Sequence, residues 1–106
     1  MKQIHSVEEL ANQAGTQYGV GRFLQFRGKY EKAFEYFKMA ARKYEELANC
    51  ENVSAKQKLD YLGKQRECME SMLVDAFSCN LPLWANIMLK LNEIDEHSCS
   101  VYYSIN

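Results

Sequence analysis

Residues 28–47, which read GKYEKAFEYFKMAARKYEEL, decide the fold of this chain. Aromatic residues and alanines recur there every three to four positions, which is the spacing of one face of an α-helix. This apolar face consists of Tyr30, Ala33, Phe34, Phe37, Ala40, Ala41, Tyr44 and Leu47. Charged residues mostly occupy the opposite side of the same helix. The pattern therefore predicts an amphipathic helix over residues 29–48.

A second helix is predicted before this stretch, over residues 7–27. Ser6 and Glu9 have the spacing of a capping box, in which the side chain of each residue accepts a hydrogen bond from the backbone N–H of the other at a helix start. Gly28 can adopt the positive φ that often ends a helix. Because the helical pattern restarts at once, the two helices are expected to form an antiparallel hairpin.

Glycines interrupt the first helix and weaken it, because glycine is a poor helix former. Ala11, Gly15 and Gly19 are spaced by four residues. We expect them to form a smooth ridge that lets a neighbouring helix approach closely.

A third helix is predicted over residues 55–77, with Ser54 and Gln57 as its capping box. Its apolar stripe is formed by Ala55, Leu59, Leu62, Met69, Leu73 and Ala76. Arg66 occupies a stripe position where an apolar residue is expected. We expect Arg66 to extend past the edge of the core or to pair with a carboxylate, and a partner-facing role is the alternative.

Pro82 is tolerated in the first turn of a helix, so a fourth helix is predicted over residues 81–95. Its apolar stripe consists of Leu81, Trp84, Ile87, Met88, Leu91 and Ile94. Residues 96–106 are predicted to be a tail. The segment SVYYSI within this tail has the composition of a strand and could also pair as an arm between molecules.

The composition predicts one all-α domain over residues 1–106. The chain has 47% hydrophobic residues and a single proline, enough to build a core. Its net charge of −1 argues against binding to nucleic acid or to an anionic membrane through a global field. Runs of apolar residues are too short for membrane insertion or for a secretory signal, so we expect a cytoplasmic protein with reduced cysteines.

The chemistry of the side chains predicts that the protein is not an enzyme and binds no cofactor. Only two histidines, His5 and His97, are present, and catalysis needs a base or nucleophile with an orienting partner. Cys79, His97 and Cys99 could approach a metal ion, but their spacing lacks the close pairs of a tetrahedral site. We therefore expect no metal.

Protein binding is the function that this composition favours, because the helices carry more apolar residues than one stripe requires. We expect these additional aromatic and methionine side chains to be exposed beside a groove, where they suit the docking of an amphipathic helix. The predicted partner-binding residues are Tyr36, Met39, Lys43, Tyr61, Arg66, Cys68 and Met72. The alternative is that the fourth helix itself fills this groove.

Two families resemble parts of this chain. Residues 14–47, AGTQYGVGRFLQFRGKYEKAFEYFKMAARKYEEL, and residues 54–73, SAKQKLDYLGKQRECMESML, resemble the helices of a microtubule-interacting and trafficking (MIT) domain. The likeness extends over about residues 7–74. The first hairpin also resembles a tetratricopeptide repeat, although no second copy follows at a period of about 34 residues.

The resemblance to MIT domains implies a three-helix bundle that captures a short helical segment of another protein, in membrane-trafficking or microtubule-linked machinery. The first functional hypothesis is therefore a non-catalytic adaptor module. The alternative is a structural subunit that forms a homodimer through its C-terminal helix and tail.

Overall fold

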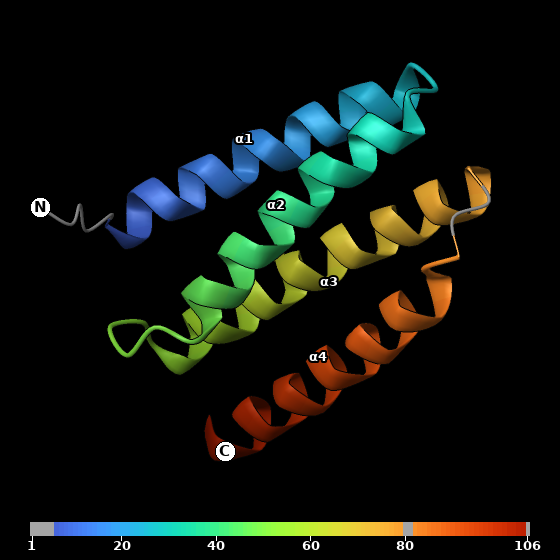
Figure 1. Ribbon diagram of the computed structural model, residues 1–106. Helices are drawn as coiled ribbons and strands as arrows, with labels where there is room; N and C mark the ends of the chain where they lie inside the picture. The colour runs from blue at the N-terminus through green and yellow to red at the C-terminus, as the bar shows by residue number, and fades with distance from the viewer. Residues whose placement is uncertain (1–5, 80–81, 106) are drawn as a thin grey trace, which may run out of the picture.

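Four α-helices make up most of the residues that the computed structural model describes, 6–79 and 82–105 (Figure 1). They are α1 (Val7–Phe26), α2 (Tyr30–Ala48), α3 (Ala55–Ser78) and α4 (Trp84–Ile105). No strand occurs among the described residues. The predicted all-α class is confirmed: a helical hairpin is followed by a third long helix and a further C-terminal helix.

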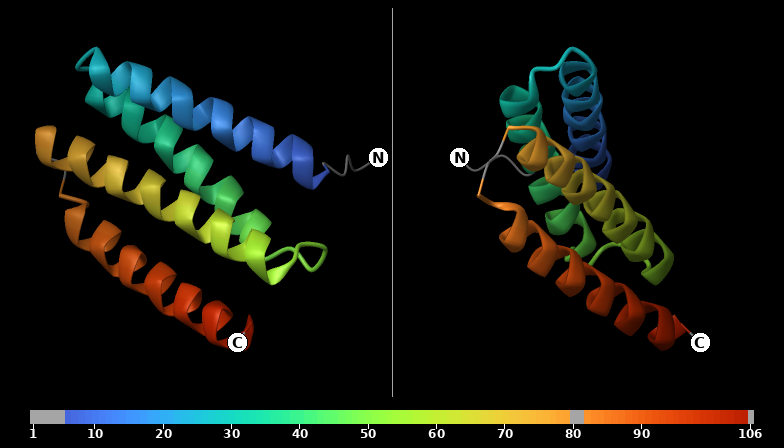
Figure 2. Two further views of the ribbon diagram at one scale, coloured as in Figure 1. Left: turned by 180° about the vertical axis from the view of Figure 1, so that it is seen from behind. Right: turned by 90° about the vertical axis from the view of Figure 1, so that its right-hand side faces the viewer.

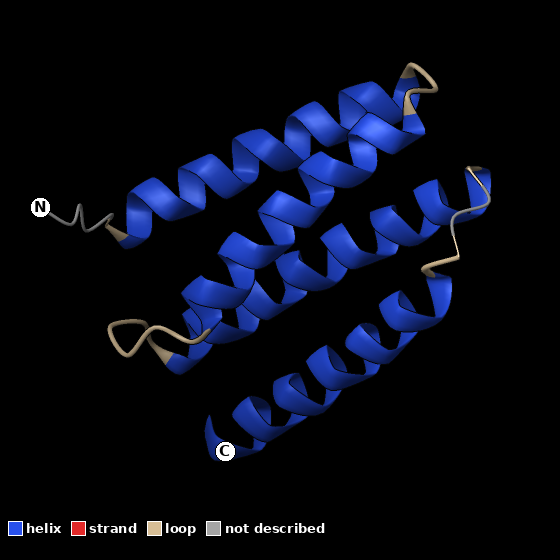
Figure 3. Cartoon of the chain, viewed as in Figure 1, coloured by secondary structure: helices blue, strands red, loops and turns tan. Residues whose placement is uncertain are grey.

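Successive helices run in opposite directions, and each one packs on the next (Figures 1 and 2). Loops join α1 to α2 and α2 to α3 (Figure 3). α1 touches α3 at few positions. The helices therefore form a row, in which α2 and α3 are each packed against two neighbours.

The predicted helix ends follow from local chemistry. The Ser6 hydroxyl accepts a hydrogen bond from the Glu9 backbone N–H at 3.1 Å, as expected at the start of α1. Gly28 has a φ of 76°, which confirms that it ends the first helix in the left-handed region. At α3, Ser54 and Gln57 form the complete capping box, with reciprocal bonds of 2.8 and 3.2 Å.

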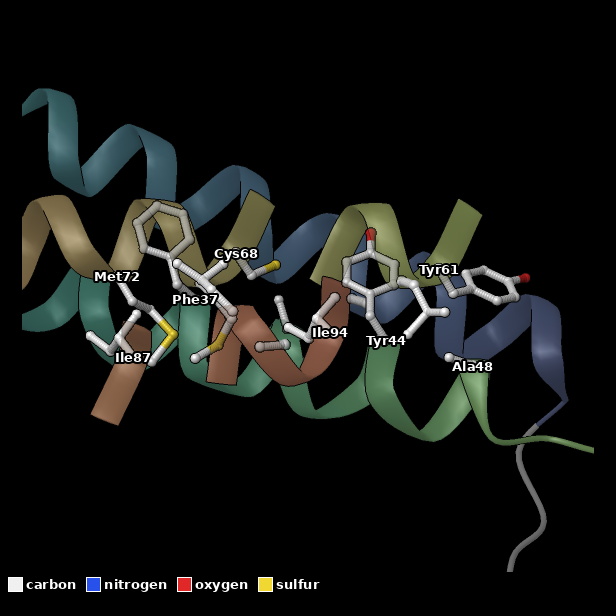
Figure 4. Packing of buried hydrophobic residues seen from close by; sticks show 14 of the residues in the cluster. Phe37, Tyr44, Ala48, Tyr61, Cys68, Met72, Ile87 and Ile94 are labelled. Atoms are coloured by element: carbon white, nitrogen blue, oxygen red, sulfur yellow. The ribbon is translucent and has the colours of Figure 1, made fainter. Parts of the chain in front are cut away.

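The core lies along α2 and α3 (Figure 4). Of the predicted apolar face of α2, all but the half-buried Tyr30 are buried. Phe37, Leu47 and Leu62 are among the largest side chains that are fully buried. The helical stripe of residues 28–47 is thus the central contact surface of the hairpin.

The close approach of α1 to α2 depends on Gly21. A Cβ atom built at Gly21 would lie 2.7 Å from Cε1 of Phe37, which is closer than real side-chain carbons come. The predicted ridge of Ala11, Gly15 and Gly19 is wrong, because a Cβ at Gly19 would meet no atom within 4 Å. The contact face of α1 instead passes through Ala14, Tyr18 and Gly21.

The predicted tail at residues 96–106 is wrong, because α4 continues through Ile105. The buried positions Ile87, Leu91 and Ile94 continue at helical spacing to Val101, which packs against the core. Polar residues between Ile94 and Val101 hide this periodicity in the sequence. The predicted start at residue 81 lies outside the described residues, and α4 begins at Trp84.

We predict opposite effects for two glycine substitutions in α1. Gly21→Ala should lower the free energy of unfolding by about 1–3 kcal/mol, because the added methyl group collides with the Phe37 ring. Gly19→Ala should raise it by about 0.5–1 kcal/mol, because alanine is the better helix former and the space is open. Urea unfolding of both variants measures the difference. Equal stability of the two variants would contradict the close contact at Gly21.

Candidate functional site

A groove lies between α2 and α4. Both helices pack on α3, but their backbones do not approach each other closely. Three surface hollows of about 240, 220 and 120 Å³ follow this line along the molecule. We call it the α2–α4 groove, and its floor on α3 consists of Leu62, Gln65, Met69 and Met72.

The first end of the groove is apolar. The hollow of about 240 Å³ is lined by Phe34, Lys38, Met69, Met72, Leu83, Asn86 and Ile87. Figure 4 shows Met72 beside Ile87. Methionine side chains adapt to the shape of an apolar neighbour, so this end of the groove suits an apolar side chain from another molecule.

An ion pair crosses the middle of the groove. The carboxylate of Glu45 on α2 accepts a hydrogen bond from the ammonium group of Lys90 on α4, and another at 3.1 Å from the buried amide of Gln65. The hydrogen bond from Lys90 lowers the pKa of Glu45, and the same bond raises the pKa of Lys90. Both side chains are partly exposed, so the pair contributes only about 0–1 kcal/mol to stability.

The charges of the groove differ between its ends. Lys38 and Arg42 lie one turn apart on α2 and line the middle hollow. Within the described part of the chain, neither forms an ion pair. At the far end, Glu93 and His97 of α4 line the hollow of about 120 Å³. The groove is therefore basic toward its apolar end and acidic toward the other.

Three of the predicted partner-binding residues lie on another side of α2, near α1. The side-chain carbonyl of Gln17 accepts a hydrogen bond from Lys43 at 3.1 Å, and the Gln17 amide lies 3.9 Å from the sulfur of Met39. Tyr36 is half-buried and shares this face by helical spacing with Lys43. These residues do not line the α2–α4 groove.

The expected exposure of three residues on α3 is wrong, because Tyr61, Cys68 and Met72 are all buried. Tyr61 stacks on Tyr44 of α2, with ring centroids 6.4 Å apart. Cys68 is fully buried, and this burial raises the pKa of its thiol to about 12. Because α3 packs against both α2 and α4, it buries two faces where a single stripe was expected. Met72 nevertheless lines the groove floor.

Arg66 pairs with carboxylates, as expected from its position in the stripe. Its guanidinium donates to both oxygens of Asp95 on α4, at 2.8 and 3.3 Å, and lies 3.1 Å from Glu70. The hydrogen bond to Asp95 raises the pKa of Arg66. Arg66 thus joins α3 to α4 on their outer side.

Sequence reasoning missed Lys38, Arg42, Leu83 and Asn86. Lys38 and Arg42 are one helical turn apart on the flank of the α2 stripe, and this spacing was a usable signal. Leu83 and Asn86 carry no such signal, because their role depends on where α4 packs.

Two further observations concern the described residues, one on metal ligands and one on membrane-spanning helices. No group of three His, Cys, Asp or Glu side chains is arranged there to hold a metal ion, and Cys79, His97 and Cys99 do not form one. Within the same residues, no helix has an apolar stretch long enough to cross a bilayer.

Comparison with models of known families, with curated proteins and with solved structures found no match to this chain. The resemblances to MIT domains and to tetratricopeptide repeats therefore remain expectations from the sequence.

The side chain of Asp75, in the last turn of α3, is ionisable and fully buried. Its Oδ1 accepts a hydrogen bond from the Gln25 amide of α1 at 2.9 Å, and its Oδ2 has no hydrogen-bond partner among the described residues. Burial raises the pKa of Asp75, and the bond from Gln25 lowers it in part. Asp75 does not line the groove, so it belongs to the α1–α3 contact.

We predict that Asp75 makes the fold less stable as the pH rises. The raised pKa of Asp75 means that the folded state favours the neutral carboxyl. The neutral carboxyl therefore stabilises the fold fully below the pKa of the unfolded chain, about 4, and this stabilisation is lost as the pH rises through the folded-state pKa. Asp75→Asn keeps an acceptor for Gln25 and removes the charge. This variant should be more stable than the wild type at pH 7, by a margin that shrinks at pH 4. Urea unfolding at both pH values measures the margin, and a constant margin would contradict the assignment.

Proposed function

We propose that the protein is a non-catalytic interaction module that holds a helical segment of a partner protein in the α2–α4 groove. The observation that carries this proposal is the continuity of the three hollows. The first two share Lys38, Met69 and Met72, and the second and third share Glu45, Gln65 and Lys90. The concave surface therefore extends along the helices.

The size of the hollows favours an elongated occupant. Each has a volume of 120–240 Å³, below the roughly 300–1,000 Å³ that is typical of small-molecule sites. A protein segment can occupy all three hollows in series. A helical segment fits best, because an amphipathic helix lays its apolar face into an apolar groove. Strand addition needs a free sheet edge, and the described residues contain no strand.

The same proposal agrees with the adaptor role that the resemblance to MIT domains implies, but it uses a different surface. The predicted residues Met39 and Lys43 lie beside Gln17 on the α1 side of α2. A link to membrane trafficking or to microtubules is proposed on the resemblance alone.

We predict that filling the apolar end of the groove abolishes binding. Asn86 is exposed and lines that end, so Asn86→Trp places a large ring in the groove while leaving the core unchanged. Helical peptides selected on the wild-type protein from a displayed library should lose about 100-fold in affinity for this variant, which corresponds to about 2.7 kcal/mol of lost apolar contact. Fluorescence anisotropy with the selected peptides measures the affinity.

Met39→Asp is the matched control, because Met39 is exposed on the α1 side of α2. It should leave peptide affinity unchanged. The proposal is overturned if Met39→Asp removes binding and Asn86→Trp does not. Circular dichroism of both variants checks that the helices remain folded.

A second candidate function is self-association through α4. The observation that favours it is a set of exposed apolar side chains on this helix, including Leu89 at 62% and Tyr103 at 75% exposure. Exposed apolar surface of this kind is common at protein interfaces. Because residues 96–105 are helical, the contact would be between helices and would not require a paired arm.

Light scattering at high micromolar concentration tests the second candidate. If α4 carries a homodimer contact, the protein should have twice the monomer mass, and the double substitution Leu89→Glu and Tyr103→Glu should return it to a monomer. A wild-type protein that is strictly monomeric at this concentration would exclude the dimer.

A further inference from the structure

We infer that the segment bound by the α2–α4 groove is acidic, with carboxylates beside its apolar face that pair with Lys38 and Arg42. This inference rests on the proposed function. It adds the chemical class of the partner and the direction in which the partner lies.

The apolar half of the groove has an excess of positive charge. The two hollows there are lined by three cations, Lys38, Arg42 and Lys90, and by one anion, Glu45. Glu45 is already occupied by Lys90 and by the amide of Gln65. Two positive charges therefore remain for an occupant.

Lys38 and Arg42 are not neutralised by carboxylates of their own helix. The nearest carboxylates along α2 belong to Glu35, Glu45 and Glu46, and none of them pairs with either cation in the described structure. Like charges four residues apart on a helix repel each other. A carboxylate placed over both would remove this repulsion and gain two charge-assisted contacts.

The charges along the groove also favour one orientation of the bound segment. The far end of the groove carries Glu93, which lies 3.6 Å from Lys90 and is largely exposed. An acidic side chain at this end would be repelled. The opposite charges of the two ends favour one orientation of the occupant, with its carboxylates over Lys38 and Arg42. The net charge of the protein is only −1, so this selection is local.

Two synthetic helical peptides test the inference. Both carry leucines at helical spacing on one face, and they differ only in having glutamates or lysines beside that face. The full chain should bind the glutamate peptide about tenfold more tightly than the lysine peptide at low salt, and added salt should reduce the difference. The double substitution Lys38→Glu and Arg42→Glu should reverse the preference. Fluorescence anisotropy measures all affinities.

The matched control is the double substitution Arg22→Glu and Lys43→Glu, which makes the same change of charge away from the groove. It should leave the preference unchanged. The acidic partner is refuted if both peptides bind the wild-type chain equally and the double substitution Lys38→Glu and Arg42→Glu leaves their affinities unchanged. The groove function stands in that case if both peptides bind more weakly to Asn86→Trp. If neither peptide binds the wild-type chain, both the acidic partner and the groove function are refuted.

Discussion

α3 has to bury two faces at once, because α2 packs on one of its sides and α4 on another. Tyr61 and Cys68 are enclosed on the side of α2, while Arg66 reaches Asp95 on the side of α4. The strip of α3 between these two contacts faces the space between α2 and α4. Met69 and Met72 lie on this strip, and they form the floor of the groove. The candidate site therefore results from the packing of α2 and α4 on different sides of α3.

Much of the fold could be predicted from the sequence, because the strongest signals are local. The stripe of α2, the positive φ of Gly28 and the capping box of Ser54 depend on residues close together in the chain. The all-α class follows from such patterns. The end of α4 could not be predicted in the same way, because Val101 is separated from Ile94 by polar residues and becomes helical through its contact with the core.

Less of the candidate site than of the fold could be predicted from the sequence. Exposure was inferred from one apolar stripe for each helix, and this assumption fails wherever a helix has two neighbours. Tyr61 and Cys68 are buried for that reason. The role of Gly21 has a similar origin: three glycines in α1 look alike in the sequence, but only the packing of Phe37 distinguishes this one from Gly19. The groove residues depend on helix packing in the same way.

The row arrangement leaves α4 attached to the rest of the protein through α3, with the Glu45–Lys90 pair as its link to α2. The distance between α2 and α4 is thus set by the packing of α4 on α3 and by the weak, partly exposed Glu45–Lys90 ion pair. A segment bound between the walls would contact α2 and α4 at once, and would add to the Glu45–Lys90 pair as a link between them. Occupancy of the groove would therefore restrict the movement of α4 relative to α2.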